Sequence, residues 1–143
     1  MQLAQIEKIL GGQKILGRKL ENKMDLVELG NIGITKKVIS HLANYLSLSW
    51  KQVAELLPVT DRTLQRYTSQ QHFNSAVSEQ VLHIAEVLAK GTEVFQEKEK
   101  LLMWLNTPHK VFSGKTPYDL LGSHFGTELV LEELGRIEFG VYS

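Results

Sequence analysis

Apolar side chains recur at helical spacing along this 143-residue chain. Between Thr35 and Leu46 they fall at positions i, i+3, i+4 and i+7, which lie on one face of a helix. The same spacing predicts helices over residues 78–90 and 93–106, and a last helix that starts near Thr127. Strands are not predicted, because the chain has three prolines and no strict alternation of apolar and polar residues. The sequence therefore predicts an all-α fold.

Turn-forming residues divide the predicted helices into three parts. The first part contains five glycines and one short apolar pattern, so we expect a lead-in helix and a loop there, with no assigned function. The last part includes a short helix for which Thr116 is the expected cap and Pro117 the first residue. The predicted parts are residues 1–34, 35–74 and 75–143.

The middle part has the layout of two short helices joined by a turn. Ser49 and Gln52 form the S-x-x-Q pattern of a capping box, in which each side chain satisfies the free backbone N–H of the other residue. Ala54 is small where the second helix is expected to cross the first. Pro58 stands where a glycine usually makes such a turn, and proline cannot adopt a positive φ. We therefore expect the turn to follow a different backbone path.

This layout is typical of a DNA-binding helix-turn-helix. Arginine can make two hydrogen bonds to guanine O6 and N7, and glutamine can do the same with adenine N6 and N7. Lys36, Lys37 and Lys51 would neutralise phosphates. An ordinary helical hairpin is the alternative interpretation. The candidate DNA-binding residues are Lys51, Thr60, Asp61, Arg62, Thr63, Gln65 and Arg66.

Charge is distributed unevenly although the net charge is zero. Residues 35–73 hold five bases and two acids, whereas residues 74–143 hold six bases and ten acids. A basic middle and an acidic end indicate different partners for the two parts. Solvated helix faces would give the same numbers by chance.

Several classes of protein do not fit the composition. The chain has no cysteine, no apolar run near the roughly 20 residues that span a bilayer, and no signal-peptide pattern at its start. Its five histidines are scattered, and neither a P-loop nor a G-x-S-x-G motif occurs. We therefore expect a cytoplasmic protein that is not an enzyme and has no cofactor, metal, membrane partner or small-molecule substrate.

Three fragments of the last part carry a family resemblance. They read W-L-N-T-P-H at residues 104–109, G-K-T-P-Y-D-L-L at 114–121 and L-G-R-I-E-F-G-V-Y at 134–142. Together they resemble the Xre/MbcA/ParS toxin-binding domain. With the helix-turn-helix before them, residues 35–143 resemble the Xre-type antitoxins of RES–Xre toxin–antitoxin modules. At Phe139, members of this family often carry histidine.

The resemblance implies a homodimeric antitoxin of a type II module. Such a protein would neutralise a RES-domain toxin, which consumes NAD, by occluding the toxin's active site with its C-terminal segment. Its helix-turn-helix would repress the module's own operon. The implied toxin-binding residues are Arg136, Glu138, Phe139, Gly140, Val141, Tyr142 and Ser143.

The apolar residues near the end of the sequence need a surface to bury them, either in this chain or in a partner. Ile137 and Val141 continue an apolar stripe of the last helix, so they are expected mainly to pack in the core or in a dimer interface. Phe139 and Tyr142 lie off that stripe and are the better candidates for toxin contact. A plain dimeric helix-turn-helix repressor without a toxin partner is the alternative function.

Overall fold

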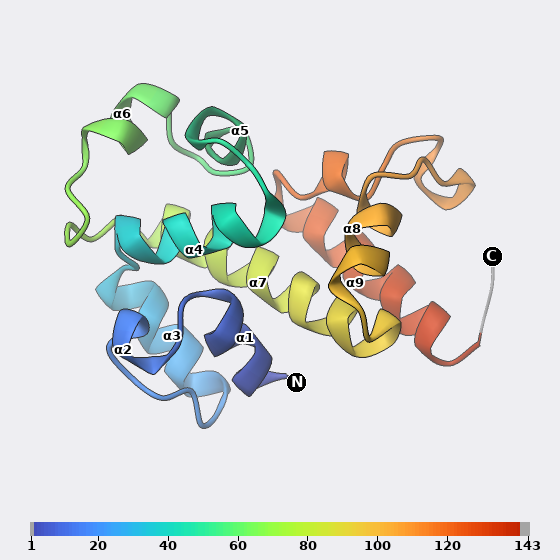
Figure 1. Ribbon diagram of the computed structural model, residues 1–143, viewed down its shortest axis with the longest axis horizontal. Helices are drawn as coiled ribbons and strands as arrows, with labels where there is room; N and C mark the ends of the chain where they lie inside the picture. The colour runs from blue at the N-terminus through green and yellow to red at the C-terminus, as the bar shows by residue number, and fades with distance from the viewer. Residues whose placement is uncertain (1, 141–143) are drawn as a thin grey trace.

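The computed structural model describes residues 2–140, which form helices and connecting turns (Figure 1). Within these residues there is no strand, and the only β-type pairing is an antiparallel bridge between Thr35 and His72. The predicted all-α fold is confirmed. The elements are α1 (Leu3–Ile9), α2 (Gln13–Leu16), α3 (Lys23–Ile32), α4 (Lys36–Leu46), α5 (Trp50–Ala54), α6 (Asp61–Arg66), α7 (Ser75–Phe95), α8 (Lys98–Leu105), the 3-10 turns η1 (Lys110–Phe112) and η2 (Tyr118–Leu120), and α9 (His124–Glu138).

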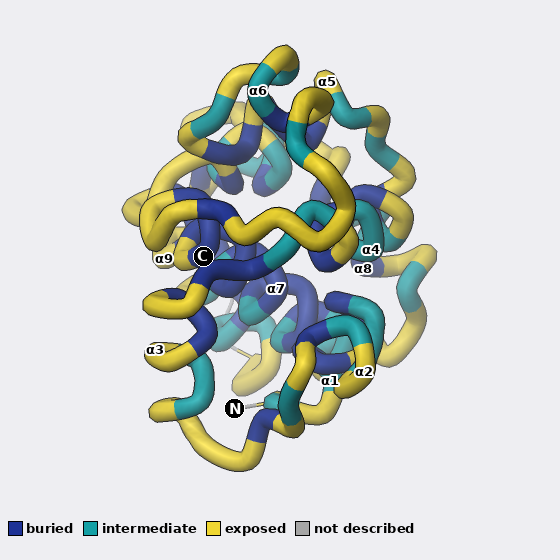
Figure 2. The backbone as a smooth tube through the Cα atoms, turned by 90° about the vertical axis from the view of Figure 1, so that its left-hand side faces the viewer, coloured by how far each residue is buried: buried dark blue, intermediate teal, exposed yellow. Residues whose placement is uncertain are grey.

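Helix α7, with 21 residues, is the centre of the molecule. Helices α1, α3, α4, α8 and α9 all contact it, so one continuous apolar core joins the N-terminal and C-terminal parts. Figure 2 shows α5 and α6 at one end of the molecule and α1, α2 and α3 at the other, with α4 and α7 between them. Along the longest axis, α6 and the end of α9 lie at opposite ends (Figure 1).

The first 34 residues form more structure than one helix and a loop. They contain three helices, and Ile6, Leu10 and Leu29 from this part are buried in the core. Helix α3 begins with a complete capping box, in which the side chain of Asn22 accepts from the backbone of Asp25 and the Asp25 side chain accepts from Asn22. The N-x-x-D spacing was the sequence signal for this helix, and the glycines had suggested a loop instead.

The break between α7 and α8 falls later in the chain than predicted. The side chain of Asn74 caps α7 by accepting a 3.0 Å hydrogen bond from Val77 N, so the helix starts before residue 78. Gly91 does not end the helix. Its role is to leave room for Leu101 of α8. A Cβ at Gly91 would lie 2.3 Å from Leu101 Cδ1. The break falls instead at Gln96, whose φ is +64°.

The segment before α9 corrects the predicted cap and the start of the last helix. Thr116 and Asp119 exchange backbone-to-side-chain hydrogen bonds of 3.1 Å each, but the turn is 3-10, starts at Tyr118 and has Pro117 as its N-cap, one residue later than predicted. Helix α9 starts at His124 because the Ser123 side chain accepts from Gly126 N at 3.0 Å. Residues 123–126 therefore form the cap and first turn, ahead of Thr127.

Candidate functional site

The helix-turn-helix predicted from the sequence is formed by α5, a turn and α6. In the capping box, Gln52 N donates to Ser49 Oγ at 3.2 Å and Ser49 N donates to Gln52 Oε1 at 2.9 Å. Val53 of α5 and Leu64 of α6 are fully buried, so these two positions hold the pair of helices against the core. The turn around Pro58 contains no residue with positive φ, which confirms that it follows another path than a glycine turn.

Helix α6 is short, and most of its surface is outside the core. Thr60 caps it by accepting from Thr63 N at 3.1 Å, and Leu64 is its one buried residue. Arg62 and Arg66 are exposed, and neither forms an ion pair within the part of the chain that the structure describes. The predicted DNA-binding residues of α6 therefore share one exposed helix.

Lys36 has a different place from the one that we expected. Its Nζ donates 2.9 Å hydrogen bonds to the backbone oxygens of Gln65 and Tyr67, where α6 ends, and it lies 5.1 Å from the ring centroid of Trp50. The ammonium group thus supports α6 from α4 and is not directed to a phosphate. Lys37 and Lys51 are exposed, as phosphate contacts require.

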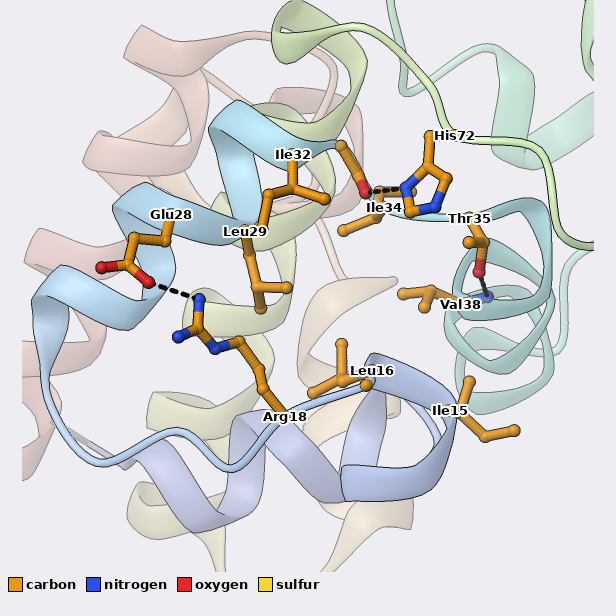
Figure 3. A pocket seen from close by; sticks show the side chains of 12 residues that line it. Ile15, Leu16, Arg18, Glu28, Leu29, Ile32, Ile34, Thr35, Val38 and His72 are labelled. Carbon is orange, nitrogen blue, oxygen red and sulfur yellow. Dashed lines mark hydrogen bonds and ion pairs between the residues drawn. The ribbon is translucent and has the colours of Figure 1, made fainter.

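The chain that leaves α6 returns to the start of α4 and is fastened there. Phe73 N donates to Ile34 O at 2.9 Å, and His72 Nδ1 lies 2.6 Å from Gly33 O. Figure 3 shows this junction beside a cavity of about 390 Å³. On the other side of the cavity, Arg18 and Glu28 form an ion pair of 2.7 Å. The N-terminal helices and the return from α6 therefore line the same cavity from two sides.

Two charged residues of the predicted toxin-binding segment already have partners in this chain. Arg136 Nε lies 2.7 Å from Glu133 Oε1, and Lys90 Nζ of α7 lies 2.6 Å from Glu138 Oε1. The hydrogen bond from Lys90 holds the pKa of the Glu138 carboxyl below its ordinary value. The Lys90–Glu138 pair fastens the last turn of α9 to α7, whereas the Arg136–Glu133 pair lies within α9.

The apolar residues of the same segment divide between the core and the surface. Val130 and Leu134 of the inward stripe are fully buried, and Ile137 is half-buried. Phe139 is 80% exposed directly after α9, and Gly140 follows it. The predicted toxin contacts Val141, Tyr142 and Ser143 lie outside the described residues.

Sequence reasoning missed two further apolar residues on the outside of α9. Phe125 is 78% exposed and Leu129 is 47% exposed. Positions 125, 129, 132, 136 and 139 alternate by four and three, so they follow one face of the helix. We call Phe125, Leu129 and Phe139 the outer stripe. Its spacing was visible in the sequence, but a helix that started at Thr127 left out Phe125.

Neither a membrane-spanning element nor a metal centre emerges from residues 2–140. None of their helices is both long enough and apolar enough to cross a bilayer. These residues also contain no group of three or more metal-ligating side chains. The predicted partner surfaces in the described residues are the exposed residues of α6 and the end of α9, to which the outer stripe adds Phe125 and Leu129.

Two family models match this chain, one over each of the two regions that contain these residues. The antitoxin Xre-like helix-turn-helix domain matches residues 31–86, and the antitoxin Xre/MbcA/ParS C-terminal toxin-binding domain matches residues 90–140. α6 lies in the first match, and the outer stripe lies in the second.

Curated relatives and a solved structure agree with the family match. An antitoxin Xre of Yersinia enterocolitica is 27% identical over 120 residues, which cover 82% of this chain and 81% of the relative. An antitoxin Xre of Photorhabdus laumondii is 22% identical over 115 residues, covering 79% and 78%. A chain of the M. tuberculosis MbcT–MbcA toxin–antitoxin complex shares the fold with a TM-score of 0.54 at 17% identity, covering 76% of this chain and 96% of that one. The chain therefore belongs to the Xre-type antitoxins, in which a helix-turn-helix domain precedes a C-terminal toxin-binding domain.

Proposed function

We propose that this antitoxin neutralises a RES-domain toxin, an enzyme that consumes NAD, by covering the toxin's active site with the end of α9 and the residues after it. As a cytoplasmic homodimer it would also repress its own operon. In neither role does the antitoxin need a cofactor or catalysis of its own. The observation that carries the toxin proposal is the outer stripe, which ends in the exposed Phe139 inside the toxin-binding domain.

Apolar exposure on this helix supports docking of a protein partner. Two phenylalanines with about four-fifths of their surface exposed are costly in water, and buried aromatic residues often dominate binding energies. The chain in the MbcT–MbcA complex, which shares this fold, comes from a toxin–antitoxin pair. Val141 and Tyr142 would extend the apolar contact, with Gly140 and Ser143 as the rest of the segment.

Charge also favours an NAD-consuming partner. Residues 74–143 carry four more acids than bases, and Glu128 and Glu132 are exposed on α9. A site that binds the pyrophosphate of NAD offers positive groups or helix N-termini. An acidic antitoxin surface therefore complements such a site. Arg136 and Glu138, with their partners inside this chain, would lie at the rim of the contact and contribute little affinity.

Deletion of residues 139–143 tests the toxin proposal. The shortened antitoxin and the RES-domain toxin that the proposal assigns to it are expressed together, and cell growth and intracellular NAD are measured. We expect the deletion to abolish protection. Met103→Ser is the matched control, since Met103 is 72% exposed on α8 and lies off the outer stripe. Full protection by the shortened antitoxin would refute occlusion by this segment, whereas no protection by the full-length protein would favour the plain repressor.

Operator binding is supported by the exposed Arg62, Gln65 and Arg66 of α6 and by the exposed Lys51 of α5. A homodimer would place two such helices in half-sites separated by about 34 Å or a multiple of it. We expect Arg62→Ala or Arg66→Ala to weaken binding to the upstream region of the operon by about 1–3 kcal/mol in gel-shift titrations. Lys110→Ala, far from α6, is the control. Unchanged affinity in both arginine variants would contradict the proposal.

A further inference from the structure

Asp61 and Gln65 form the one side-chain pair within α6 whose geometry bears on base recognition. Gln65 Nε2 donates a 2.7 Å hydrogen bond to Asp61 Oδ1, one helical turn away, on the exposed side of the helix. An ionised carboxylate only accepts hydrogen bonds, so it attracts the NH₂ group of the amide and repels the amide oxygen. The pair therefore fixes which end of the Gln65 amide is the donor end.

We propose that Asp61 is a positioning residue that orients Gln65 to read adenine in the major groove. The inference rests on the proposed operator binding. The amide nitrogen has two hydrogens, so Gln65 can donate one to Asp61 and the other to adenine N7, while Oε1 accepts from adenine N6. Asp61 itself contacts no base in this arrangement, which changes the role that the sequence had suggested for it.

Loss of Asp61 leaves the amide free to rotate. With its ends exchanged, a glutamine can donate to guanine O6 or thymine O4, or accept from cytosine N4. The consequence is relaxed specificity at one base pair of each half-site. Overall DNA affinity does not fall in parallel, because the carboxylate also repels the phosphate backbone. A role in helix stability alone would instead weaken binding to all sequences equally.

The test measures base preference with purified full-length protein. A duplex library with randomised positions is selected with the wild type, and affinity is then measured by fluorescence anisotropy for the four bases at each preferred adenine. A bidentate contact discriminates between bases by about tenfold or more. We expect Gln65→Ala to abolish the preference at one position, and Asp61→Ala to reduce it there at least about fivefold, with non-specific affinity equal or higher. Asp61→Asn, which removes the charge but keeps an acceptor oxygen, should retain more of the preference than Asp61→Ala.

Each outcome supports or overturns the inference. If Asp61→Ala keeps the wild-type preference within twofold while Gln65→Ala loses it, Asp61 does not position Gln65. An unchanged profile in Gln65→Ala also overturns it. Equal loss of affinity for all four bases in Asp61→Ala, with a lower thermal midpoint, would assign Asp61 to helix stability. A wild type that selects no sequence would contradict operator recognition itself.

Discussion

Helices α6 and α9 carry the two proposed partner surfaces, and they are held in place in different ways. Helix α6 has six residues and one buried side chain, Leu64, so its position depends on bonds from other elements, above all from Lys36. Helix α9 has 15 residues and packs along α7 through a buried stripe. A short element displays most of its side chains, whereas a long one displays only the face that the core leaves uncovered.

The difference extends to the charged residues. On α6 the two arginines are exposed and have no ion-pair partner within residues 2–140, so they remain available to DNA. On α9, Arg136 and Glu138 are engaged with neighbours in the same chain. We infer that recognition by α6 is mainly polar and recognition by the end of α9 mainly apolar. Helix α6 and the end of α9 lie at opposite ends of the longest axis (Figure 1), so the proposed DNA and toxin partners need not compete for space.

The largest effect is expected where α9 is anchored by its first turn. A Cβ on Gly126 would lie 1.8 Å from the backbone oxygen of Leu120, so the two segments cannot stay together. Gly126→Ala should lower the free energy of unfolding by about 3 kcal/mol, measured by urea denaturation. Gly135→Ala on the same helix meets no atom within 4 Å and should raise it by about 0.5–1 kcal/mol. Equal stability of the two variants would show that packing of the first turn does not hold α9.

The next largest effect is expected for two lysine variants, which distinguish a residue that supports α6 from one that contacts DNA. Lys36→Met removes the charged donor to the end of α6 and should cost about 1.5 kcal/mol of stability. The slope of log affinity against log salt should not change, because no phosphate contact is lost. Lys51→Met should leave the free energy of unfolding within about 0.5 kcal/mol of the wild-type value. It should reduce the slope of log affinity against log salt by about 0.9. A reduced salt slope in Lys36→Met would show that Lys36 contacts a phosphate, as the sequence had suggested.

Local patterns explain why the helix-turn-helix could be predicted in detail. The capping box at Ser49 and the cap at Thr60 depend on residues within one helical turn, and both are present. The bond from Lys36 joins residues 29 and 31 positions apart, and no short motif encodes it. Likewise, the predicted break between residues 90 and 93 fell at Gly91, where the glycine instead makes room for Leu101 of another helix, a contact that no local pattern reveals.

Prediction of the toxin-binding end had a different limit. Periodicity identified the buried stripe through Val130 and Leu134, and the family motifs marked the domain. Neither gave the partner of Glu138, since Lys90 lies 48 residues earlier on α7. The outer stripe required the correct start of α9, which depends on the cap at Ser123. Sequence therefore located the domain, and tertiary packing decided which of its charged side chains are paired.

The smallest effect concerns the pairing of Glu138 and is best seen as a change in titration. Because the bond from Lys90 lowers the pKa of Glu138, it stabilises the fold above the ordinary carboxyl value of 4.5. This contribution is lost as the pH falls through the lowered pKa. In Lys90→Met, NMR titration of the Glu138 carboxyl carbon should give a pKa closer to 4.5, and the loss of stability between neutral and acid pH should become smaller. Lys100→Met removes a lysine that is paired with Glu97 at 3.5 Å and should leave the Glu138 titration unchanged. A Glu138 pKa that does not move in Lys90→Met would mean that Lys90 does not hold the carboxylate, which would then be free for the proposed toxin contact, as the arginines of α6 are for the proposed DNA contact.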